Sequence, residues 1–193
     1  MSSRSNAMLH QACEDAVLVK FWNHFDDGST HGYVLEVGPQ FFLLALVGED
    51  MRFNGFQCLR LQDVRRLQVP DPYADFVVAA LRKRGQRIRK KPNVDISELP
   101  ALLISANRLF PIVTIHRERV KPDSCWIGRV LDVTNKSVLL HEIGPDAVWD
   151  KKSTRFQLSE ITRVEFGGGY EEALHLVGGS LKQQKKSVRP SRA

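Results

Sequence analysis

Apolar and polar residues alternate in short runs along much of the chain, which is the pattern that half-buried β-strands produce. Two such runs, 17–21 and 113–115, open the two halves of the chain. Turns that contain Asp, Gly, Pro and Ser follow at 26–29 and 121–124, where these residues favour a reversal of the backbone. The pattern predicts a mainly β protein.

Longer apolar runs predict the second and third strands of each half, at 31–37, 41–47, 127–133 and 137–143. Gly32 and Gly128 lie at the start of the second strand in their respective halves. A strand can bend sharply where a side chain is missing. We therefore expect the sheet to be strongly curved at these two glycines.

A tight corner follows the fourth predicted strand, which ends at Leu61 in one half and at Leu158 in the other. Only Gln62-Asp63 and Ser159-Glu160 separate that strand from a fifth apolar run. Five short strands with so short a corner are typical of a bent, closing sheet. The sequence thus predicts a small five-stranded barrel in each half.

The two halves repeat one another. Residues 32–50 align with 128–146 at a constant offset of 96, and eight of the nineteen pairs are identical. The alignment resumes at an offset of 97, between 61–81 and 158–178. A period this long exceeds that of solenoid repeats. We interpret it as a duplicated domain.

Helices are predicted after each barrel and between the two. Pro72 and Tyr73 begin the first, and Gly169 and Tyr170 begin its shorter counterpart, where we expect both tyrosines to pack. Ser97 can cap a third helix that carries a stripe of leucines up to residue 109.

The unit resembles the Sm-like group of small SH3-like barrels, in its five-strand order, its second-strand glycine and its tight corner, over residues 15–81 and 111–178. The resemblance implies a mainly β fold with accessory helices: two tandem five-stranded Sm/SH3-like barrels, each followed by a helix. Sm and Hfq proteins read uridines through an Asp-x-x-Met-Asn stretch and an Arg-Gly or Tyr-Lys-His motif. The matching regions, VTNKSVLL (133–140) and QLSEITRV (157–164) in the second half, carry neither, so no binding residue of the family is carried over.

This interpretation divides the chain into five parts. They are a flexible N-terminus (1–14), the first barrel with its helix (15–84), a basic connector with a helix (85–110), the second barrel with its helix (111–178) and a disordered basic tail (179–193).

Charge is distributed unevenly along the chain, although the net charge is only +6. Residues 82–91 carry seven basic groups and residues 181–193 carry five, and neither stretch contains an acid. The chain has 28 Lys and Arg residues, so 16 lie outside these two stretches, together with all 22 acidic residues. The rest of the chain therefore has a net charge of −6. An acidic body therefore carries two basic appendages.

The first appendage, residues 82–91, is called the basic segment below. Its Gly85 and the following Pro92 indicate a frayed helix end or mobile connector. Three interpretations compete: a solvated linker, a contact to nucleic acid, and docking on an acidic surface, including that of the protein itself. The candidate phosphate-binding residues are Arg82, Lys83, Arg84, Arg87, Arg89, Lys90 and Lys91.

Two aromatic residues, Phe53 and Trp149, occupy equivalent loop positions after the third strand. They are candidates for a ligand contact, although a ring in this place more often plugs a barrel end. The six histidines show no metal-binding spacing, and the three cysteines form no CxxC pair. We expect no metal, no cofactor and no catalysis.

The sequence favours a non-enzymatic binding or scaffolding protein, with sequence-independent RNA or DNA binding by the basic segment and the tail as the alternative. The longest apolar run is far short of a membrane span, and no charged-then-apolar leader opens the chain. We therefore expect a cytoplasmic protein without membrane contact. Its partner is an unknown protein or a second copy, since exposed edge strands can pair into a homodimer.

Overall fold

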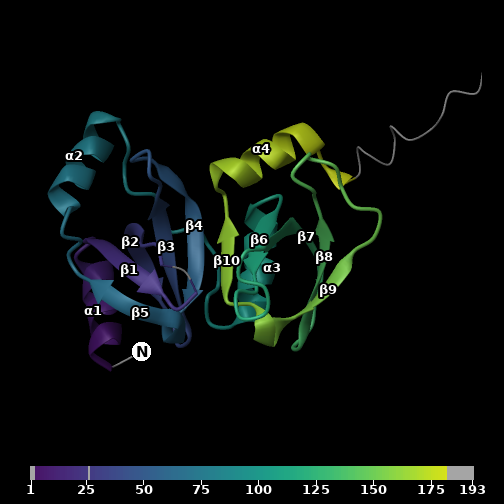
Figure 1. The fold of residues 1–193 in the computed structure, drawn as a ribbon, viewed down its shortest axis with the longest axis horizontal. Coiled ribbons are helices and arrows are strands. Elements are labelled where there is room, and N and C mark those ends of the chain that lie inside the picture. Colours follow the sequence, from purple (N-terminus) through teal and green to yellow (C-terminus); the bar gives the residue numbers. More distant parts are fainter. Residues whose placement is uncertain (1–2, 26, 182–193) are drawn as a thin grey trace, which may run out of the picture.

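The computed structural model describes residues 3–25 and 27–181, and it is mainly β with accessory helices, as predicted. The tail residues 182–193, expected to be disordered, lie outside the described residues. In Figure 1 the first half of the chain lies on the left and the second half on the right. The helices α2 (Ala74–Lys83) and α4 (Gly169–Gly178) lie along the upper end of the molecule, one over each half (Figure 1).

The remaining elements follow the predicted order closely. The first half contains β1 (Leu18–Asn23), β2 (Thr30–Val37), β3 (Phe41–Val47), β4 (Phe53–Arg60) and β5 (Val64–Gln68). The second contains β6 (Val113–His116), β7 (Cys125–Val133), β8 (Ser137–Glu142), β9 (Thr154–Gln157) and β10 (Arg163–Phe166). The other two α-helices are α1 (Ser3–Glu14) and α3 (Leu99–Leu109). Within the described ranges, no helix has the length and apolar character needed to cross a membrane.

All ten strands belong to one open sheet, in the order β5-β1-β2-β3-β4-β10-β6-β7-β8-β9. The order of strands within each half is the same. Antiparallel pairing of β4 with β10, from Leu59↔Arg163 to Phe56↔Phe166, joins the halves. The sequence suggested two separate barrels, whereas the structure has one continuous sheet to which each half contributes five strands.

The predicted corner and the predicted glycines both have a clear physical role. A 3₁₀ turn connects the fourth strand to the fifth in each half, at Leu61–Asp63 and at Leu158–Glu160. A Cβ on Gly32 would come within 2.5 Å of a carbonyl oxygen on β3, and one on Gly128 within 2.2 Å of a carbonyl oxygen on β8. Neighbouring strands approach so closely there that no side chain fits.

The N-terminal prediction is wrong for residues 3–14. This stretch forms α1, which packs against β2, with Leu9 and Ala12 fully buried. Leu9 joins a cluster that includes Phe21 and Phe42. The helix is held because burying these side chains offsets the entropy lost on ordering the chain.

The helix between the halves is found where the leucine stripe predicted it, but its start differs. Glu98, not Ser97, is the residue before the first turn of α3, and no side chain caps it. Asn107 ties α3 to β7, because its side-chain amide both donates to and accepts from the backbone of Val130, at 3.0 and 3.1 Å. α3 thereby becomes part of the second half.

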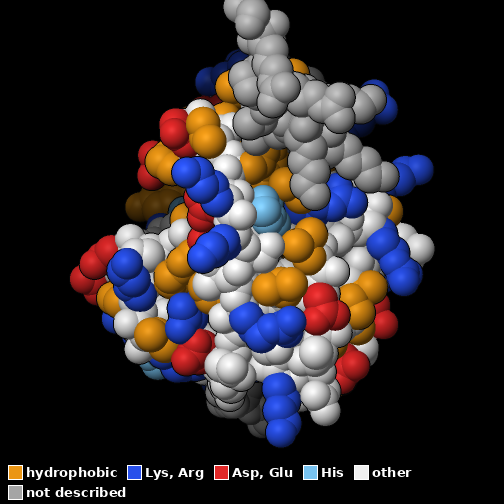
Figure 2. All heavy atoms as spheres, turned by 90° about the vertical axis from the view of Figure 1, so that its right-hand side faces the viewer, with side chains coloured by type: hydrophobic (Ala, Val, Ile, Leu, Met, Phe, Trp, Pro, Cys, Tyr) orange, Lys and Arg blue, Asp and Glu red, His pale blue; other side chains and the backbone are white. Residues whose placement is uncertain are grey.

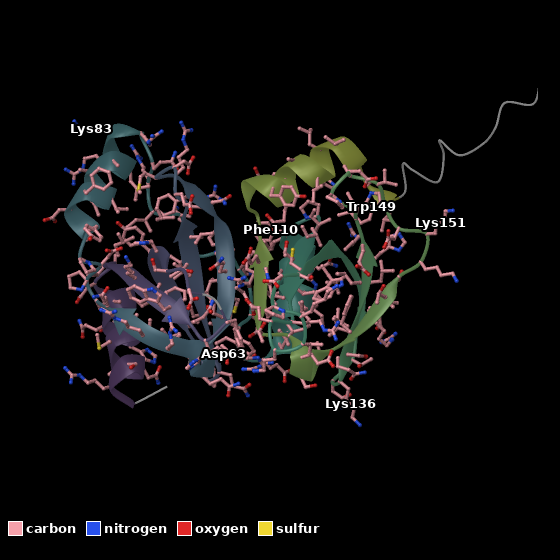
Figure 3. All side chains as sticks on the ribbon, viewed as in Figure 1. Asp63, Lys83, Phe110, Lys136, Trp149 and Lys151 are labelled. Carbon is pink, nitrogen blue, oxygen red and sulfur yellow. The ribbon has the colours of Figure 1, made fainter. Side chains whose placement is uncertain are left out.

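The hydrophobic core runs through both halves. Phe56 on β4 and Phe166 on β10 lie with ring centroids 5.8 Å apart, and Phe110 lies 4.9 Å from Phe166. Figure 3 shows Phe110 between the two halves. These three rings and the strand pairing make the halves one packed unit.

Polar side chains reinforce the same junction. The side-chain nitrogen of Gln57 on β4 donates to Glu165 on β10 at 2.9 Å, and Arg163 pairs with Glu118 at 3.0 Å. Burial by itself would raise the pKa of Glu165. A hydrogen bond from His116 and the charge of Arg163 outweigh it and hold that pKa below its usual value.

Substitution of two glycines tests how closely the halves approach. Gly55 and Gly85 both have a left-handed φ, of 74° and 67°. A Cβ on Gly55 would lie 2.5 Å from the backbone nitrogen of Gly168, whereas one on Gly85 would meet nothing within 4 Å. We expect Gly85→Ala to lower the free energy of unfolding by about 1 kcal/mol through backbone strain alone. Gly55→Ala should lower it by about 3 kcal/mol, since overpacking is added.

Urea unfolding of the two variants beside the parent chain measures this difference. Equal losses would contradict the close approach of β4 to the start of α4.

Candidate functional site

The basic segment begins in the last turn of α2, where Arg82 and Lys83 lie (Figure 3). Positive side chains are favoured at this end of a helix because the unpaired carbonyl groups carry partial negative charge. The backbone nitrogens of Arg84 and Gly85 bond back to Ala80 and Arg82 and close the helix. Gly85, with its left-handed φ, turns the chain out of it.

Three contacts hold the rest of the basic segment against the sheet. The side-chain oxygen of Gln86 accepts a hydrogen bond from the backbone nitrogen of Phe53 at 3.2 Å. The Arg89 guanidinium lies 5.8 Å from the centroid of the Phe56 ring and donates to the carbonyl of Gly167 at 3.4 Å. Lys91 pairs with Glu36 at 3.0 Å. The segment therefore follows a defined path from α2 to the junction of β4 with β10.

The seven basic side chains divide into two groups. Lys91 docks on an acidic residue of the protein itself, as one of the three interpretations of the sequence has it, and Arg89 docks on a ring and a carbonyl group. The other five are exposed and form no hydrogen bond or ion pair with any residue in the described part of the chain. They are Arg82, Lys83, Arg84, Arg87 and Lys90.

A pocket of about 730 Å³ opens beside this segment, between α2 and the loops that precede β2 and follow β3. We call it the α2 pocket. Tyr73, at the start of α2, and Phe76 and Val77 in its first turn line one side, and Met51 of the loop and Asn54 of β4 line the other. Tyr73 and Phe76 are 63% and 64% exposed. Tyr73 was expected to pack, so that expectation is wrong for this residue.

A buried carboxylate organises the polar side of the α2 pocket. Asp71 is 2% exposed; its Oδ1 accepts from the backbone nitrogen of Tyr73 at 2.8 Å, and its Oδ2 pairs with Nδ1 of His31. The other ring nitrogen of His31 lies 3.4 Å from the Ser29 hydroxyl, and both residues line the pocket. Asp71 thus fixes the orientation of a histidine that faces the pocket.

The second half has a hollow at the equivalent place, of about 410 Å³, with Tyr170 in the position of Tyr73. Tyr170 is 55% exposed, again contrary to expectation. The wall differs because Ile127 stands in the place of His31 and Ala173 in that of Phe76. The second hollow therefore lacks the second ring on the helix and the histidine, and Trp126 lines it from β7.

The two aromatic candidates from the sequence lie in the interior. Phe53 and Trp149 are each 7% exposed. The Phe53 ring packs 6.0 Å from that of Tyr33, and the Trp149 indole donates to the carbonyls of Gly178 and Gly179 at the end of α4 (Figure 3). Neither presents an exposed ring face to a ligand.

Cysteine chemistry and metal binding find little support in the geometry. Among the described residues, no three His, Cys, Asp or Glu side chains lie so that they could hold a metal ion. The three cysteines are unpaired. Burial raises the pKa of the Cys58 thiol far above its ordinary value, and burial followed by the charge of Glu165 raises that of Cys125. Both thiols are therefore held in the protonated, weakly nucleophilic form.

Comparisons with known proteins identify no family and no function for this chain. No protein-family model and no curated protein matches the chain. Among solved structures, YcgR of Escherichia coli in complex with c-di-GMP is 13% identical, with 94% of this chain and 90% of that one covered and a TM-score of 0.18. MrkH of K. pneumonia is 10% identical, with coverage of 96% and 94% and a TM-score of 0.17. At TM-scores this low, neither likeness carries an argument.

Removal of Asp71 tests whether this carboxylate organises the pocket wall. Asp71→Ala would leave the backbone N–H of Tyr73 and the ring of His31 without their partner. We expect the free energy of unfolding to fall by about 2–3 kcal/mol, which is typical of a buried polar group left unsatisfied.

Asp75→Ala is the matched control, because Asp75 is an exposed acid in the first turn of the same helix. This control should lower the free energy of unfolding by about 0.5 kcal/mol, because only the favourable interaction of the carboxylate with the helix dipole is lost. Thermal unfolding monitored by circular dichroism compares the two variants, and equal losses would contradict the role of Asp71.

Proposed function

We propose that this chain is a non-enzymatic binding protein that holds a nucleic acid strand by its phosphates on the basic segment. The observation that supports this proposal is the group of five exposed basic side chains without an acidic partner in the described part of the chain. Lys and Arg at this density bind phosphates without regard to base sequence. The pairing of Lys91 with Glu36 and the docking of Arg89 on Gly167 account for two of the seven charges and leave these five available.

The path of the segment favours this function over that of a solvated linker. A linker needs no contacts with the body, whereas Gln86, Arg89 and Lys91 each make at least one. Fixing the backbone before a ligand arrives reduces the entropy lost on binding. The free charges are thus presented from an anchored stretch of chain.

We also propose that the two halves are copies of one Sm-like small barrel. The proposal is supported by the identical order of strands in each half, by the 3₁₀ turn before the fifth strand and by the glycine in the second strand. Binding by the basic segment does not require it.

Neutralising the five free charges tests the proposed function. We expect the variant with Gln at positions 82, 83, 84, 87 and 90 to lose most of its affinity for a fluorescent mixed-sequence single-stranded oligonucleotide at low salt. The slope of log affinity against log salt should become shallower by about 3.5, since each phosphate contact to a single strand contributes roughly 0.7. Fluorescence anisotropy at several salt concentrations measures both quantities.

A control variant of equal net charge separates local contact from long-range attraction. It carries Gln at five exposed basic positions of the second half: Lys121, Arg129, Lys136, Lys151 and Lys152. In Figure 2 the Lys and Arg side chains of that side are scattered among acidic ones rather than gathered in one patch. The control should keep most of the affinity and nearly the full slope. Equal losses in both variants, or none in either, would overturn the assignment.

Self-association is a second proposal, based on the two ends of the sheet. Among the described strands, β5 and β9 are the outer members, each paired on one side only. β5 is the fifth strand of the first half, as β10 is of the second, and β9 is the fourth strand of the second half, as β4 is of the first. β4 and β10 pair with each other inside the chain. By the same register, Gln68 of one copy would face Thr154 of another, as Glu165 faces Gln57. Such a contact is head-to-tail and can extend to further copies.

Like charges placed on these two edges test the second proposal. We expect the parent chain to show a mass above 21.9 kDa that falls on dilution. The variant Gln68→Lys/Thr154→Lys should sediment as a monomer, because like charges directly opposite each other weaken strand pairing. Analytical ultracentrifugation over a range of concentrations measures the mass of both proteins. A parent chain that is monomeric at every concentration contradicts pairing of the edges.

A further inference from the structure

The α2 pocket and the basic segment are connected through α2 and through one hydrogen bond. The segment leaves the C-terminal end of α2, and the pocket is lined by residues at its N-terminal end. Arg82 lies nine positions after Tyr73, about 13 Å along a helix axis. The segment then returns to the pocket rim, because Gln86 bonds to Phe53, which lies between the lining residues Met51 and Asn54.

Two aromatic rings are exposed at the mouth of the pocket, where they would otherwise be expected to pack. Only Val77 and Leu81 of α2 are buried, so the buried stripe of this helix is narrow. Tyr73 and Phe76 are three residues apart and lie outside that stripe. Lys20 lies 5.4 Å from the centroid of the Tyr73 ring and adds a positive charge there. Exposed rings beside positive charge are the arrangement that binds single-stranded nucleic acid.

Hydrogen-bonding groups line the inner wall. His31 is held by Asp71 and faces Ser29. Asn54 accepts a hydrogen bond from the backbone nitrogen of Gly169 through Oδ1, at 2.8 Å, and its amide N–H groups are left to donate. Glu49 adds a carboxylate, which would repel a phosphate but can accept from the amino group of a base. The pocket therefore suits a planar, uncharged ring with polar edges.

We propose that the α2 pocket accepts an unpaired nucleobase of a strand whose phosphates lie on the basic segment, so that the protein prefers single-stranded to double-stranded nucleic acid. This inference rests on the proposed function. A base in a duplex cannot enter the pocket without leaving its stack, whereas a base of a single strand is free to do so. The hollow of the second half, without Phe76 and His31 equivalents, is not expected to bind a base.

The experiment compares affinities for a fluorescent single-stranded DNA 12-mer and the duplex of the same sequence. We expect Tyr73→Ala/Phe76→Ala to weaken binding of the single strand by roughly 5- to 150-fold, the effect of losing one stacked base. Binding of the duplex should change less than two-fold. The salt slope should stay the same, because no phosphate contact is removed. Tyr73→Phe should retain the affinity, and Tyr170→Ala, in the second hollow, should leave it unchanged.

A direct probe of the pocket is the methyl group of Met51, which lines it. Uncharged thymidine or adenosine should shift the Met51 methyl NMR signal of the parent chain, and Tyr73→Ala/Phe76→Ala should abolish that shift. An unmoved Met51 signal in the presence of the 12-mer would overturn the inference, even if the affinity falls in the variant.

The two proposals can fail separately. In one outcome the five-Gln variant loses binding, while Tyr73→Ala/Phe76→Ala keeps it. Inorganic polyphosphate then displaces the 12-mer as effectively per charge as DNA does. This result would mean that the basic segment binds phosphate and that the pocket binds no base. If the five-Gln variant binds as the parent does, the proposed function itself is wrong.

Discussion

The antiparallel pairing of β4 with β10 is the constraint on which the rest of the structure depends. It turns the two halves into one sheet and brings Phe56, Phe110 and Phe166 into one core. The buried ion pair between Arg163 on β10 and Glu118 lies next to this pairing, and the hydroxyl of Thr162 also donates to Glu118. Loss of this pairing would expose apolar surface on both halves at once.

The same pairing determines where the basic segment runs. Arg89 lies over the ring of Phe56 on β4 and donates to Gly167, the residue after β10, so that its position depends on both strands being in place. The segment crosses the junction instead of hanging from α2. Its two docked side chains anchor it, and its other five basic side chains are exposed. Stability of the junction and availability of the charges are therefore linked.

The sequence predicted the local elements well and the long-range ones less well. Strands, the 3₁₀ corner and the helices after them are encoded by patterns a few residues long, and these agree with the structure. The burial of Leu9 and Ala12 in α1 depends on β2, so the composition of the N-terminus alone suggested flexibility. Likewise, Phe56 and Phe166 are 110 residues apart, and no local pattern specifies that β4 pairs with β10.

Aromatic residues show why the candidate site was only half predictable. Phe53 and Trp149 were singled out because both halves keep a ring there, yet both are buried, whereas Tyr73 and Tyr170, which are also kept in both halves, are exposed. Phe76 has no aromatic counterpart, since Ala173 stands in its place. It is exposed because α2 buries only the stripe through Val77 and Leu81. Agreement between the two halves therefore does not by itself separate a core ring from an exposed one, because exposure depends on which stripe of each helix faces the sheet. Phe76 is an exposed ring that the first half carries and the second half lacks, so it marks where the surfaces of the two halves differ.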